Sequence, residues 1–334
     1  QLRHMYDYAV GGGMRFRPCL MYLAYLVCSA GIDGEGGRVG GDGADNLIQL
    51  ASAVELLHKA SLVHDDLIDG DALRRGQQSF HATFGSERAV VMGDLLVAMA
   101  HDVAERMRPV LPAGVYCQIR FHFNKAHLDL CRGELLELVA ARRERPLARD
   151  YVDRVIEGKT ASLMEQSMAM GAIMAGAPAA CVDALARYGR YMGFVFQTIN
   201  DINNLTGFDL DIKGQAMTDL ALGRVGYHVL GLEMTAGMEQ VGLLASEIKR
   251  VERADDGLRL RKLVQKGRLR IWLDGVICEY ADQARQALKA LPECGARDAL
   301  DSIGREMFES WFWNPESSID CLGGGCSEKC SPSD

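Results

Sequence analysis

Apolar residues recur every three or four positions along most of this chain, which is the spacing of one face of an α-helix. One such stripe runs through Leu47, Leu50, Val54 and Leu57. Alternating runs of Val, Ile, Thr and Tyr, which would indicate strands, are missing from the sequence. We therefore predict an all-α fold, a bundle of long helices at about residues 18–30, 44–70, 87–107, 114–142, 148–176, 178–207, 218–250, 256–290 and 296–313.

Proline and glycine mark the breaks between these segments. Most of the eight prolines fall between the periodic stretches, where they begin helices or linkers. The glycine-rich stretch 33–43 predicts a flexible loop rather than a phosphate-binding loop, because no strand leads into it. Beyond Pro315 the composition shifts to Ser, Gly, Cys and acidic residues. We therefore expect one helical domain at 1–314 and a disordered, cysteine-rich tail at 315–334.

The composition excludes several other classes of protein. With 334 residues, of which 48% are hydrophobic, the chain can bury a large core, and its net charge of -8 argues against a nucleic-acid partner. The longest uninterrupted apolar run, 19–28, is about half of the roughly 20 residues that cross a bilayer, so we expect no transmembrane segment. The chain does not open on a secretory signal pattern, and its ten cysteines follow no disulfide spacing. We therefore expect reduced thiols and a cytoplasmic protein.

Three carboxylates stand within five residues at the end of the helix predicted at 44–70. Asp65 and Asp69 are four residues apart and share one helical face, and Asp66 lies about 100° round the helix, so we expect all three to reach one side. Anions this close repel one another unless a cation lies between them. Oxygen ligands beside a phosphate-bearing substrate suit Mg²⁺. The alternative is a solvated acidic helix end without a ligand.

Two arginines follow this acidic motif at once. Arg74 and Arg75 lie within one or two turns of it and place fixed cations beside an anionic metal site. Such an arrangement suits a diphosphate, whose remaining oxygens would bind the metal. We therefore interpret residues 65–75 as part of a metal-dependent diphosphate site.

A second polar cluster repeats the same spacing further along the chain. Asn200, Asp201 and Asn204 occupy positions i, i+1 and i+4 of the helix predicted at 178–207, with amides at the two ends of the motif. In a helical bundle, two such clusters on facing helices would form the two walls of one metal site. Taken alone, the second cluster would more often be a polar helix face.

With these motifs the chain resembles the trans-isoprenyl diphosphate synthases, the family of farnesyl, geranylgeranyl and longer polyprenyl diphosphate synthases. Residues 12–18 read GGMRFRP, similar to the family's GGKRxRP, and residues 57–64 lead into the first acidic motif as the family pattern does. Further matches follow in the family's order: Phe84-Gly85, Gly93-Asp94, Gly133-Glu134, Lys159-Thr160 and Phe196-Gln197. The chain is identified as a divergent member, because its second motif is altered.

The resemblance implies a deep central cavity inside the helical bundle, with both motifs at its mouth and two or three Mg²⁺ ions between them. It also implies a homodimer. The implied metal ligands are Asp65, Asp66, Asp69, Asn200, Asp201 and Asn204. The residues implied to act on an allylic diphosphate are the same three residues of the first motif with Lys159, Gln197, Arg74 and Arg224. Those implied to bind the diphosphate of isopentenyl diphosphate are Arg17, His58 and Arg75.

The reaction implied is Mg²⁺-dependent transfer of C1 of an allylic prenyl diphosphate to an acceptor, with isopentenyl diphosphate as the first candidate. Three departures from the family pattern lie on the acceptor or second-metal side, and one of them is Gln215, which stands where the family has a lysine shortly after the second motif. Met14 stands where the family has a lysine that contacts isopentenyl diphosphate, and amides replace carboxylates in the second motif. Prenyl transfer to a different acceptor, terpene cyclisation, and an inactive partner subunit of a heteromeric synthase therefore stay open as alternatives.

Two small residues, Ala60 and Ser61, stand one turn before Asp65 and are expected to line the prenyl-chain pocket. In the family, bulky aromatic residues here close the cavity at short chain length, so small ones predict a chain of C20 or longer. The alternative is that another helix supplies the floor, with Phe121 or Phe123 as candidates.

Overall fold

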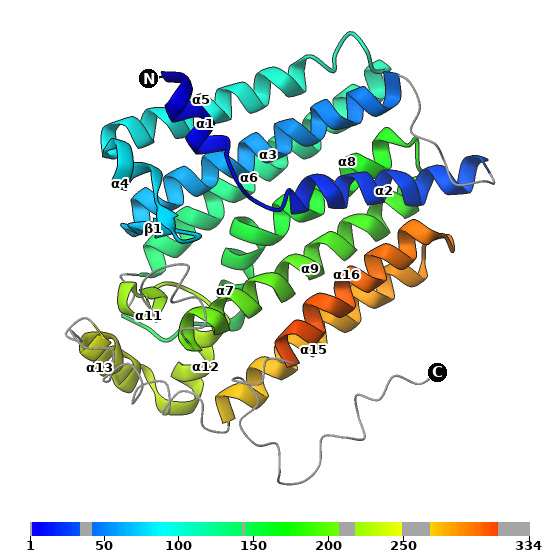
Figure 1. The fold of residues 1–334 in the computed structure, drawn as a ribbon. Helices are drawn as coiled ribbons and strands as arrows, with labels where there is room; N and C mark the ends of the chain where they lie inside the picture. The colour runs from blue at the N-terminus through cyan, green and yellow to red at the C-terminus, as the bar shows by residue number, and fades with distance from the viewer. Residues whose placement is uncertain (1, 34–41, 142–143, 207–217, 249–267, 313–334) are drawn as a thin grey trace.

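Almost every residue described lies in a helix (Figure 1), which confirms the all-α prediction. The structure is a computed structural model and describes residues 2–33, 42–141, 144–206, 218–248 and 268–312. Its α-helices are α1 (Leu2–Val10), α2 (Phe16–Asp33), α3 (Asp42–Asp69), α4 (Phe80–Phe84), α5 (Ser86–Glu105), α6 (Ala113–Ala140), α7 (Arg149–Ile156), α8 (Ser162–Met174), α9 (Ala179–Thr206), α11 (Thr218–Leu222), α12 (Tyr227–Ala236), α13 (Met238–Ile248), α15 (Arg268–Lys289) and α16 (Gly295–Phe312). A π-helical turn, η1 (Glu157–Ala161), joins α7 to α8, and a small hairpin consists of β1 (Leu73–Arg74) and β2 (Gln77–Gln78).

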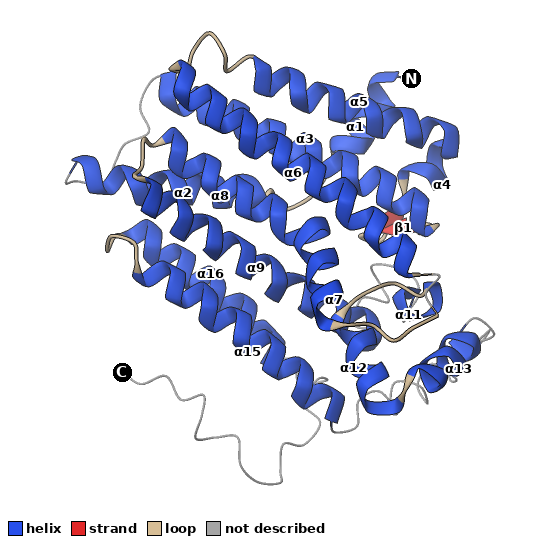
Figure 2. Ribbon diagram, turned by 180° about the vertical axis from the view of Figure 1, so that it is seen from behind, coloured by secondary structure: helices blue, strands red, loops and turns tan. Residues whose placement is uncertain are grey.

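The long helices pack side by side in layers. Figure 1 shows α5 and α3 along one edge of the molecule, α15 and α16 along the opposite edge, and α2, α8 and α9 between them. Figure 2, seen from behind, shows α6 running alongside α8. Because α2, α6 and α9 all pack on α8, every residue from Ser162 to Ile173 except Glu165 is buried. A helix that is apolar on all sides belongs at such a central position.

The core between the layers is apolar. Leu20 of α2, Met168 of α8 and Tyr188 of α9 belong to one buried cluster. Further toward the edge, the rings of Phe194 on α9 and Tyr280 on α15 stack with centroids 4.4 Å apart. Burial of each large apolar side chain contributes about 1.5–3 kcal/mol. The apolar stripes seen in the sequence are therefore the surfaces that hold the bundle together.

The segment predicted as one helix at 218–250 is broken, so that part of the prediction is wrong. Its described residues form α11, α12 and α13. Gly223 and Gly237 lie at the two breaks, and both have positive φ, 74° and 86°. Such left-handed glycines end helices. The tail at 315–334 and most of the stretch 33–43 lie outside the described residues.

The β1–β2 hairpin is a feature that the apolar pattern does not predict. Leu73 pairs with Gln78 and Arg74 pairs with Gln77 in an antiparallel register. The two turn residues, Arg75 and Gly76, both have positive φ, 53° and 75°. This is the geometry of a type I′ turn. The turn fixes two arginine side chains directly after the end of α3.

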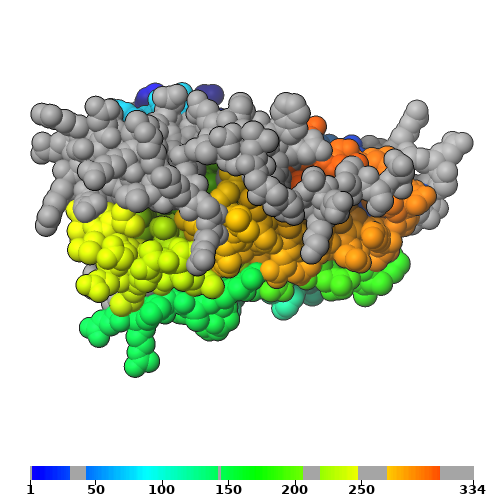
Figure 3. Space-filling view, turned by 90° about the horizontal axis from the view of Figure 1, so that it is seen from below, coloured from blue at the N-terminus to red at the C-terminus, as the bar shows by residue number. Residues whose placement is uncertain are grey.

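The segment after the second motif folds back on the C-terminal helices. Figure 3 shows α12 and α13 in yellow beside α15 in orange. The Tyr227 and Tyr280 hydroxyls lie 2.9 Å apart and join α12 to α15. None of the described helices combines the length and apolarity needed to cross a bilayer.

Candidate active site

The bundle contains a cavity of about 840 Å³. Its lining combines side chains from α2, α3, the β1–β2 hairpin, α6, η1, α9 and the start of α12. Three predicted site residues, Ala60, Asp66 and Asn204, do not line it. The other predicted site residues all do: Arg17, His58, Ser61, Asp65, Asp69, Arg74, Arg75, Lys159, Gln197, Asn200, Asp201 and Arg224.

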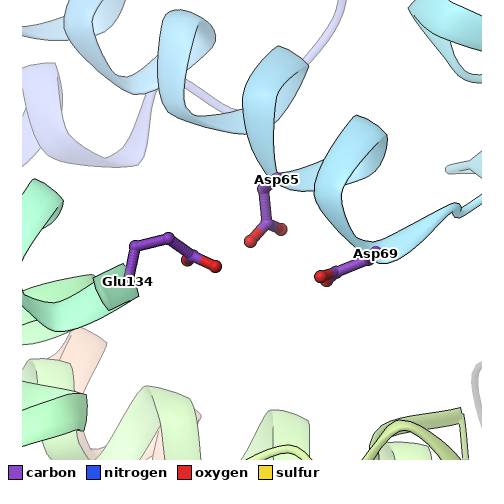
Figure 4. Close-up of side chains that lie close together, drawn as sticks. All are labelled: Asp65, Asp69 and Glu134. Atoms are coloured by element: carbon purple, nitrogen blue, oxygen red, sulfur yellow. The ribbon is translucent and has the colours of Figure 1, made fainter. Parts of the chain in front are cut away.

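Carboxylates from two helices converge on one side of this cavity. Asp65 and Asp69 project from the end of α3 toward Glu134 of α6, and one oxygen of each lies within 4.8 Å of the others (Figure 4). We call these three residues, together with Glu137 one turn further along α6, the acidic wall. The sequence prediction of site residues does not include the two glutamates. Their spacing of three residues, which puts both on one helical face, is the signal that points to them.

Asp65 and Asp69 of the acidic wall lie at the C-terminal end of α3, where negative charge is unfavourable. α3 ends at Asp69, and the next residue, Gly70, has a left-handed φ of 71°. The carbonyl end of a helix carries partial negative charge, so carboxylates in its last turn are destabilised. Asp65 and Asp69 therefore depend on neighbouring cations for stabilisation.

Lys159 supplies one such cation. Its Nζ lies 3.3 Å from Asp65 Oδ1 and 2.7 Å from Glu134 Oε2. It also lies 2.5 Å from Glu137 Oε2. Burial lowers the pKa of Lys159, but these carboxylates outweigh burial and raise the pKa well above its usual value. The ammonium is therefore charged at neutral pH.

Arg224 supplies a second cation from the segment between α11 and α12. It contacts Asp69, and its Nη1 lies 3.4 Å from Glu137 Oε2. The amide of Val225 donates to Glu137 Oε1 at 3.1 Å. Burial raises the pKa of Glu137 to about 7. These contacts anchor the segment after the second motif on α6, next to the first motif.

Within the part of the chain that the structure describes, carboxylates outnumber cations around this wall. Five carboxylates lie against three cationic side chains, which leaves two negative charges unbalanced when all are ionised. One divalent cation would balance them. The carboxylates belong to Asp65, Asp66, Asp69, Glu134 and Glu137, and the cations belong to Arg74, Lys159 and Arg224.

Lys159 reaches the acidic wall because η1 and α6 pack with their backbones almost touching. A Cβ at Gly133 would lie 2.5 Å from the Lys159 amide nitrogen. A Cβ at Gly158 would lie 2.7 Å from a carbonyl oxygen of α6. The π-helical turn at Glu157–Ala161 locally widens the helix, and such turns are common at functional sites. The two glycines and the π-turn together direct Lys159 into the cavity.

Asp66, unlike Asp65 and Asp69, does not line the cavity, and its role as a metal ligand stays a prediction. Its side chain is buried and contacts Arg74 Nε, while Arg74 Nη2 lies 3.2 Å from Asp65 Oδ2. The rotation of about 100° between neighbouring residues of a helix explains this difference. Burial raises the pKa of Asp66 to about 6, although Arg74 opposes the shift. Asp66 therefore holds Arg74 beside the acidic wall.

The second motif lines the cavity from α9, and its one carboxylate is occupied by protein groups. Gln197 Nε2 donates to Asp201 Oδ1 at 2.7 Å. The amide of Tyr227 donates to Asp201 Oδ2 at 3.2 Å, and His228 Nδ1 lies 3.3 Å from the same oxygen. Burial lowers the pKa of His228, but Asp201 outweighs burial and raises it. Both oxygens of Asp201 thus have partners within the chain.

The two amides of this motif have different positions. Asn200 lines the cavity. Asn204 is buried, and its Oδ1 accepts the N–H of Asp219 at 3.4 Å. That Asn204 binds a metal stays a prediction.

Another part of the cavity lining is basic. We call Arg15, Arg17, His58 and Arg75 the basic wall. Arg17 Nη1 lies 3.1 Å from His58 Nε2. Burial and then the charge of Arg17 lower the pKa of His58 well below its usual value, so its imidazole is neutral and accepts from Arg17. Glu55 pairs with Arg15 at 2.6 Å. Among the residues described, it is the one carboxylate that pairs with the basic wall. The excess of positive charge favours an anionic ligand.

One cavity therefore contains a metal-binding arrangement of carboxylates and an anion-binding arrangement of arginines. The family model described as polyprenyl synthetase matches residues 1–263 of the sequence. The chain belongs to the polyprenyl synthetase family.

The relatives of this polyprenyl synthetase make prenyl diphosphates of several lengths. The all-trans-nonaprenyl-diphosphate synthase (geranyl-diphosphate specific) of Rhodobacter capsulatus is 29% identical over 299 residues, which cover 88% of this chain and 84% of that protein. The heptaprenyl diphosphate synthase component 2 of Geobacillus stearothermophilus is 31% identical over 306 residues, 87% of this chain and 84% of that protein.

A solved structure shows the same fold. The polyprenyl synthase of Caulobacter crescentus, complexed with calcium and isoprenyl diphosphate, has a TM-score of 0.76 at 27% identity and covers 92% of this chain and 87% of its own. The chain is therefore a prenyltransferase with the all-α isoprenoid-synthase fold.

The two small residues before the first motif of this polyprenyl synthetase face different ways. Ser61 lines the cavity. Ala60 is buried between α3 and α5 in a cluster with Val63 and Met92 and is not among the residues that line the cavity, so its role beside the prenyl chain stays a prediction. The two phenylalanines considered as a floor do not line the cavity either. Phe123 is buried in the core, and Phe121 is exposed on α6.

Proposed function

We propose that this chain catalyses Mg²⁺-dependent transfer of an allylic prenyl group from its diphosphate to isopentenyl diphosphate, making a polyprenyl diphosphate of C20 or longer. The observation that carries the proposal is the single cavity that has both an acidic wall and a basic wall. An allylic diphosphate needs a metal and cations to depart, and a second diphosphate needs cations alone. The cavity offers one wall for each.

Asp65, Asp69 and Glu134 are the residues we assign to Mg²⁺, and we expect two or three ions in the loaded enzyme. Their oxygens converge within 4.8 Å, and the region has two unbalanced negative charges when its five carboxylates are all ionised. Carboxylate oxygens are hard ligands that fit Mg²⁺ bound jointly by protein and substrate phosphates. When bound, the metal would stabilise the negative charge that develops on the leaving diphosphate.

The side chains around the acidic wall bind and orient the allylic diphosphate. Arg74, Lys159 and Arg224 hold its oxygens while the C1–oxygen bond breaks and the electron pair leaves with the diphosphate. The resulting allylic cation is kept from water by apolar side chains that line the cavity, among them Leu57, Leu62, Val97 and Leu130.

The basic wall binds the second diphosphate and so places the acceptor alkene. Arg17 and Arg75 would pair with the diphosphate of isopentenyl diphosphate, beside the neutral imidazole of His58. The alkene electrons form the new carbon–carbon bond to C1, and a proton then leaves the acceptor carbon skeleton to a diphosphate oxygen. No protein nucleophile is required for this sequence of steps.

Two observations favour a second candidate function, transfer to a different acceptor or cyclisation of the allylic cation. Met14 carries no charge at the mouth of the basic wall. Asp201, the one carboxylate of the second motif, is bound by protein groups. Both features lie outside the acidic wall, so either reaction would still begin with ionisation of an allylic diphosphate.

We propose that the chain functions as a homodimer through α6. Phe121, Leu128 and Leu135 are spaced by seven residues on this helix and are 64%, 53% and 62% exposed. Such a stripe is typical of a surface that packs on a partner helix. Leu128→Glu should shift the mass measured by light scattering from dimer to monomer, while Val91→Glu, at a 67% exposed apolar residue of α5, should not. A monomeric wild type would contradict this assignment.

We also propose that the enzyme acts in the cytoplasm. The seven cysteines within the described ranges all have free thiols, which supports a reducing compartment.

A product assay tests the proposed function. Purified protein is incubated with Mg²⁺ and a C10, C15 or C20 allylic diphosphate, with and without isopentenyl diphosphate, and the products are identified by mass spectrometry. Products longer by multiples of five carbons, formed only with isopentenyl diphosphate, are expected. Diphosphate release without elongation would overturn the acceptor assignment and favour the second candidate.

A further inference from the structure

The loop before α2 is bound by a buried lysine of another element, Lys59, which the proposed mechanism does not use. Lys59 comes from α3, is 5% exposed, and is not among the residues that line the cavity. Its Nζ donates to Gly11 O at 2.7 Å and to Gly12 O at 2.9 Å. Glu55 Oε1 lies 4.0 Å away, too far for a hydrogen bond. Two of the three N–H groups of the ammonium therefore fix the loop backbone.

The next residue of this loop, Gly13, is surrounded by three cationic side chains. A Cβ at Gly13 would lie 2.7 Å from Arg75 Nη1. It would also lie 3.3 Å from Lys59 Nζ and 3.5 Å from Arg15 Nη1. The φ of Gly13 is 90°, a conformation that residues with a side chain rarely adopt. Like charges gathered this closely repel one another, and an anion bound against the loop would relieve the repulsion.

The charge of Lys59 is only partly balanced, because Glu55 Oε1 lies 4.0 Å from its Nζ and is already bound to Arg15 at 2.6 Å. An ammonium in a poorly hydrated site loses solvation, and here burial lowers its pKa to about 8. An apolar side chain of similar length would fill the same space without that penalty. Met14, the residue of this loop that lies at the mouth of the cavity, is 80% exposed and uncharged. The loop therefore takes its buried positive charge from a neighbouring helix.

We propose that Lys59 is a positioning residue for the acceptor diphosphate: it fixes the loop at residues 11–13 and supplies from α3 the positive charge that Met14 does not. The inference rests on the proposed function, because it assigns that loop to the diphosphate of a non-allylic prenyl acceptor. Lys59 acts through the loop backbone and through its charge, whereas Arg17 and Arg75 line the cavity and contact the ligand.

Binding of isopentenyl diphosphate, measured by calorimetry without Mg²⁺ or allylic substrate, tests this assignment. Lys59→Met should weaken binding by about tenfold or more, because it removes a buried charge beside the loop and the two charge-assisted hydrogen bonds that fix the loop backbone. Lys59→Arg, which keeps the charge, should recover part of the affinity. In steady-state assays, Lys59→Met should raise KM for isopentenyl diphosphate and leave KM for the allylic substrate within about twofold. Lys125→Met, which removes a lysine of α6 that does not line the cavity, is the matched control and should change neither.

A second variant covers a failure of Lys59→Met to fold. Lys59→Gln removes the charge but keeps an amide that can still donate to the loop carbonyls, so it should weaken the same binding with a melting temperature near that of the wild type. Unchanged affinity in Lys59→Met, or an equal rise in KM for both substrates, would overturn the inference. If the wild type does not bind isopentenyl diphosphate, the acceptor assignment fails. Inorganic pyrophosphate then serves as the probe, and the inference about Lys59 stands only if Lys59→Met weakens its binding.

Discussion

At the residue scale, the neighbouring carboxylates Asp65 and Asp66 have different surroundings. Asp65 faces the cavity with Glu134, whereas Asp66 is buried against Arg74. We expect Asp65→Asn to lower kcat by about a hundredfold or more and to raise the Mg²⁺ concentration needed for half-maximal activity. Asp66→Asn should lower kcat by less than about tenfold, because it weakens only the positioning of Arg74. Pyrophosphate release at graded Mg²⁺ concentrations measures both, and equal shifts in Mg²⁺ dependence would contradict the assignment.

The ionisation of Lys59 gives a pH dependence with a definite sign. Burial lowers its pKa to about 8; Glu55 opposes the shift, and Arg15, Arg75 and Arg74 add to it. A bound diphosphate stabilises the ammonium, so affinity should be full below pH 8 and fall as the pH rises above it. The decline is at most tenfold per pH unit, since one proton is involved.

Calorimetry with isopentenyl diphosphate at pH 7, 8 and 9 measures this decline. Lys59→Arg is the control, because arginine stays charged across the range. If the wild type and this variant decline in parallel, another group is responsible.

The sequence predicts some of these residues and not others for a physical reason. Asp65 and Asp69 belong to a local spacing that is readable from one helix. Glu134 belongs to the site only because α6 packs across from α3, and the contact of Lys59 with the loop depends on how α3 lies beside α2. Local patterns identify groups on one element, whereas tertiary packing decides which groups meet.

At the element scale, the close contact between α6 and η1 places the cation of the acidic wall. Gly133→Ala would put a methyl carbon 2.5 Å from the Lys159 amide, against rigid backbone. We expect the free energy of unfolding to fall by about 1–3 kcal/mol and activity to fall with it, because α6 and η1 must separate. Gly114→Ala, on the same helix with nothing within 4 Å, should leave both nearly unchanged. Thermal melts followed by circular dichroism compare the stability of the two variants, and activity assays run in parallel. Equal stability of the two variants would show that the contact between α6 and η1 can relax.

Most of the long helices were predictable from periodicity, but α1, α4, the breaks between α11, α12 and α13, and two turns were not. A pattern of three and four residues is present in α3, α6 and α9, so their existence follows from the sequence. The π-turn at Glu157–Ala161 and the hairpin turn at Arg75-Gly76 involve too few residues to show a period. Both position charged side chains of the site, so local backbone geometry carries functional detail that the apolar pattern lacks.

At the scale of the whole molecule, the cavity limits the length of the prenyl chain. Ser61 lines the cavity, whereas its neighbour Ala60 packs between α3 and α5. Ser61→Phe should therefore shorten the longest product, because the aromatic ring would occupy the chain's path. Ala60→Phe should instead lower the melting temperature, because it overpacks a buried cluster. Mass spectrometry of products with a thermal melt separates the two effects, and an unchanged product spectrum in Ser61→Phe would contradict the assignment of this side of the cavity.

The central claim is that one cavity holds two diphosphates on opposite kinds of wall. A crystal structure of the protein with Mg²⁺, isopentenyl diphosphate and an allylic analogue that has sulfur in place of the C1-bound oxygen tests it directly. The account predicts metal density against Asp65, Asp69 and Glu134, and a metal-free diphosphate between Arg17 and Arg75. A single diphosphate bound at the acidic wall, with the basic wall closed by protein side chains, would contradict it.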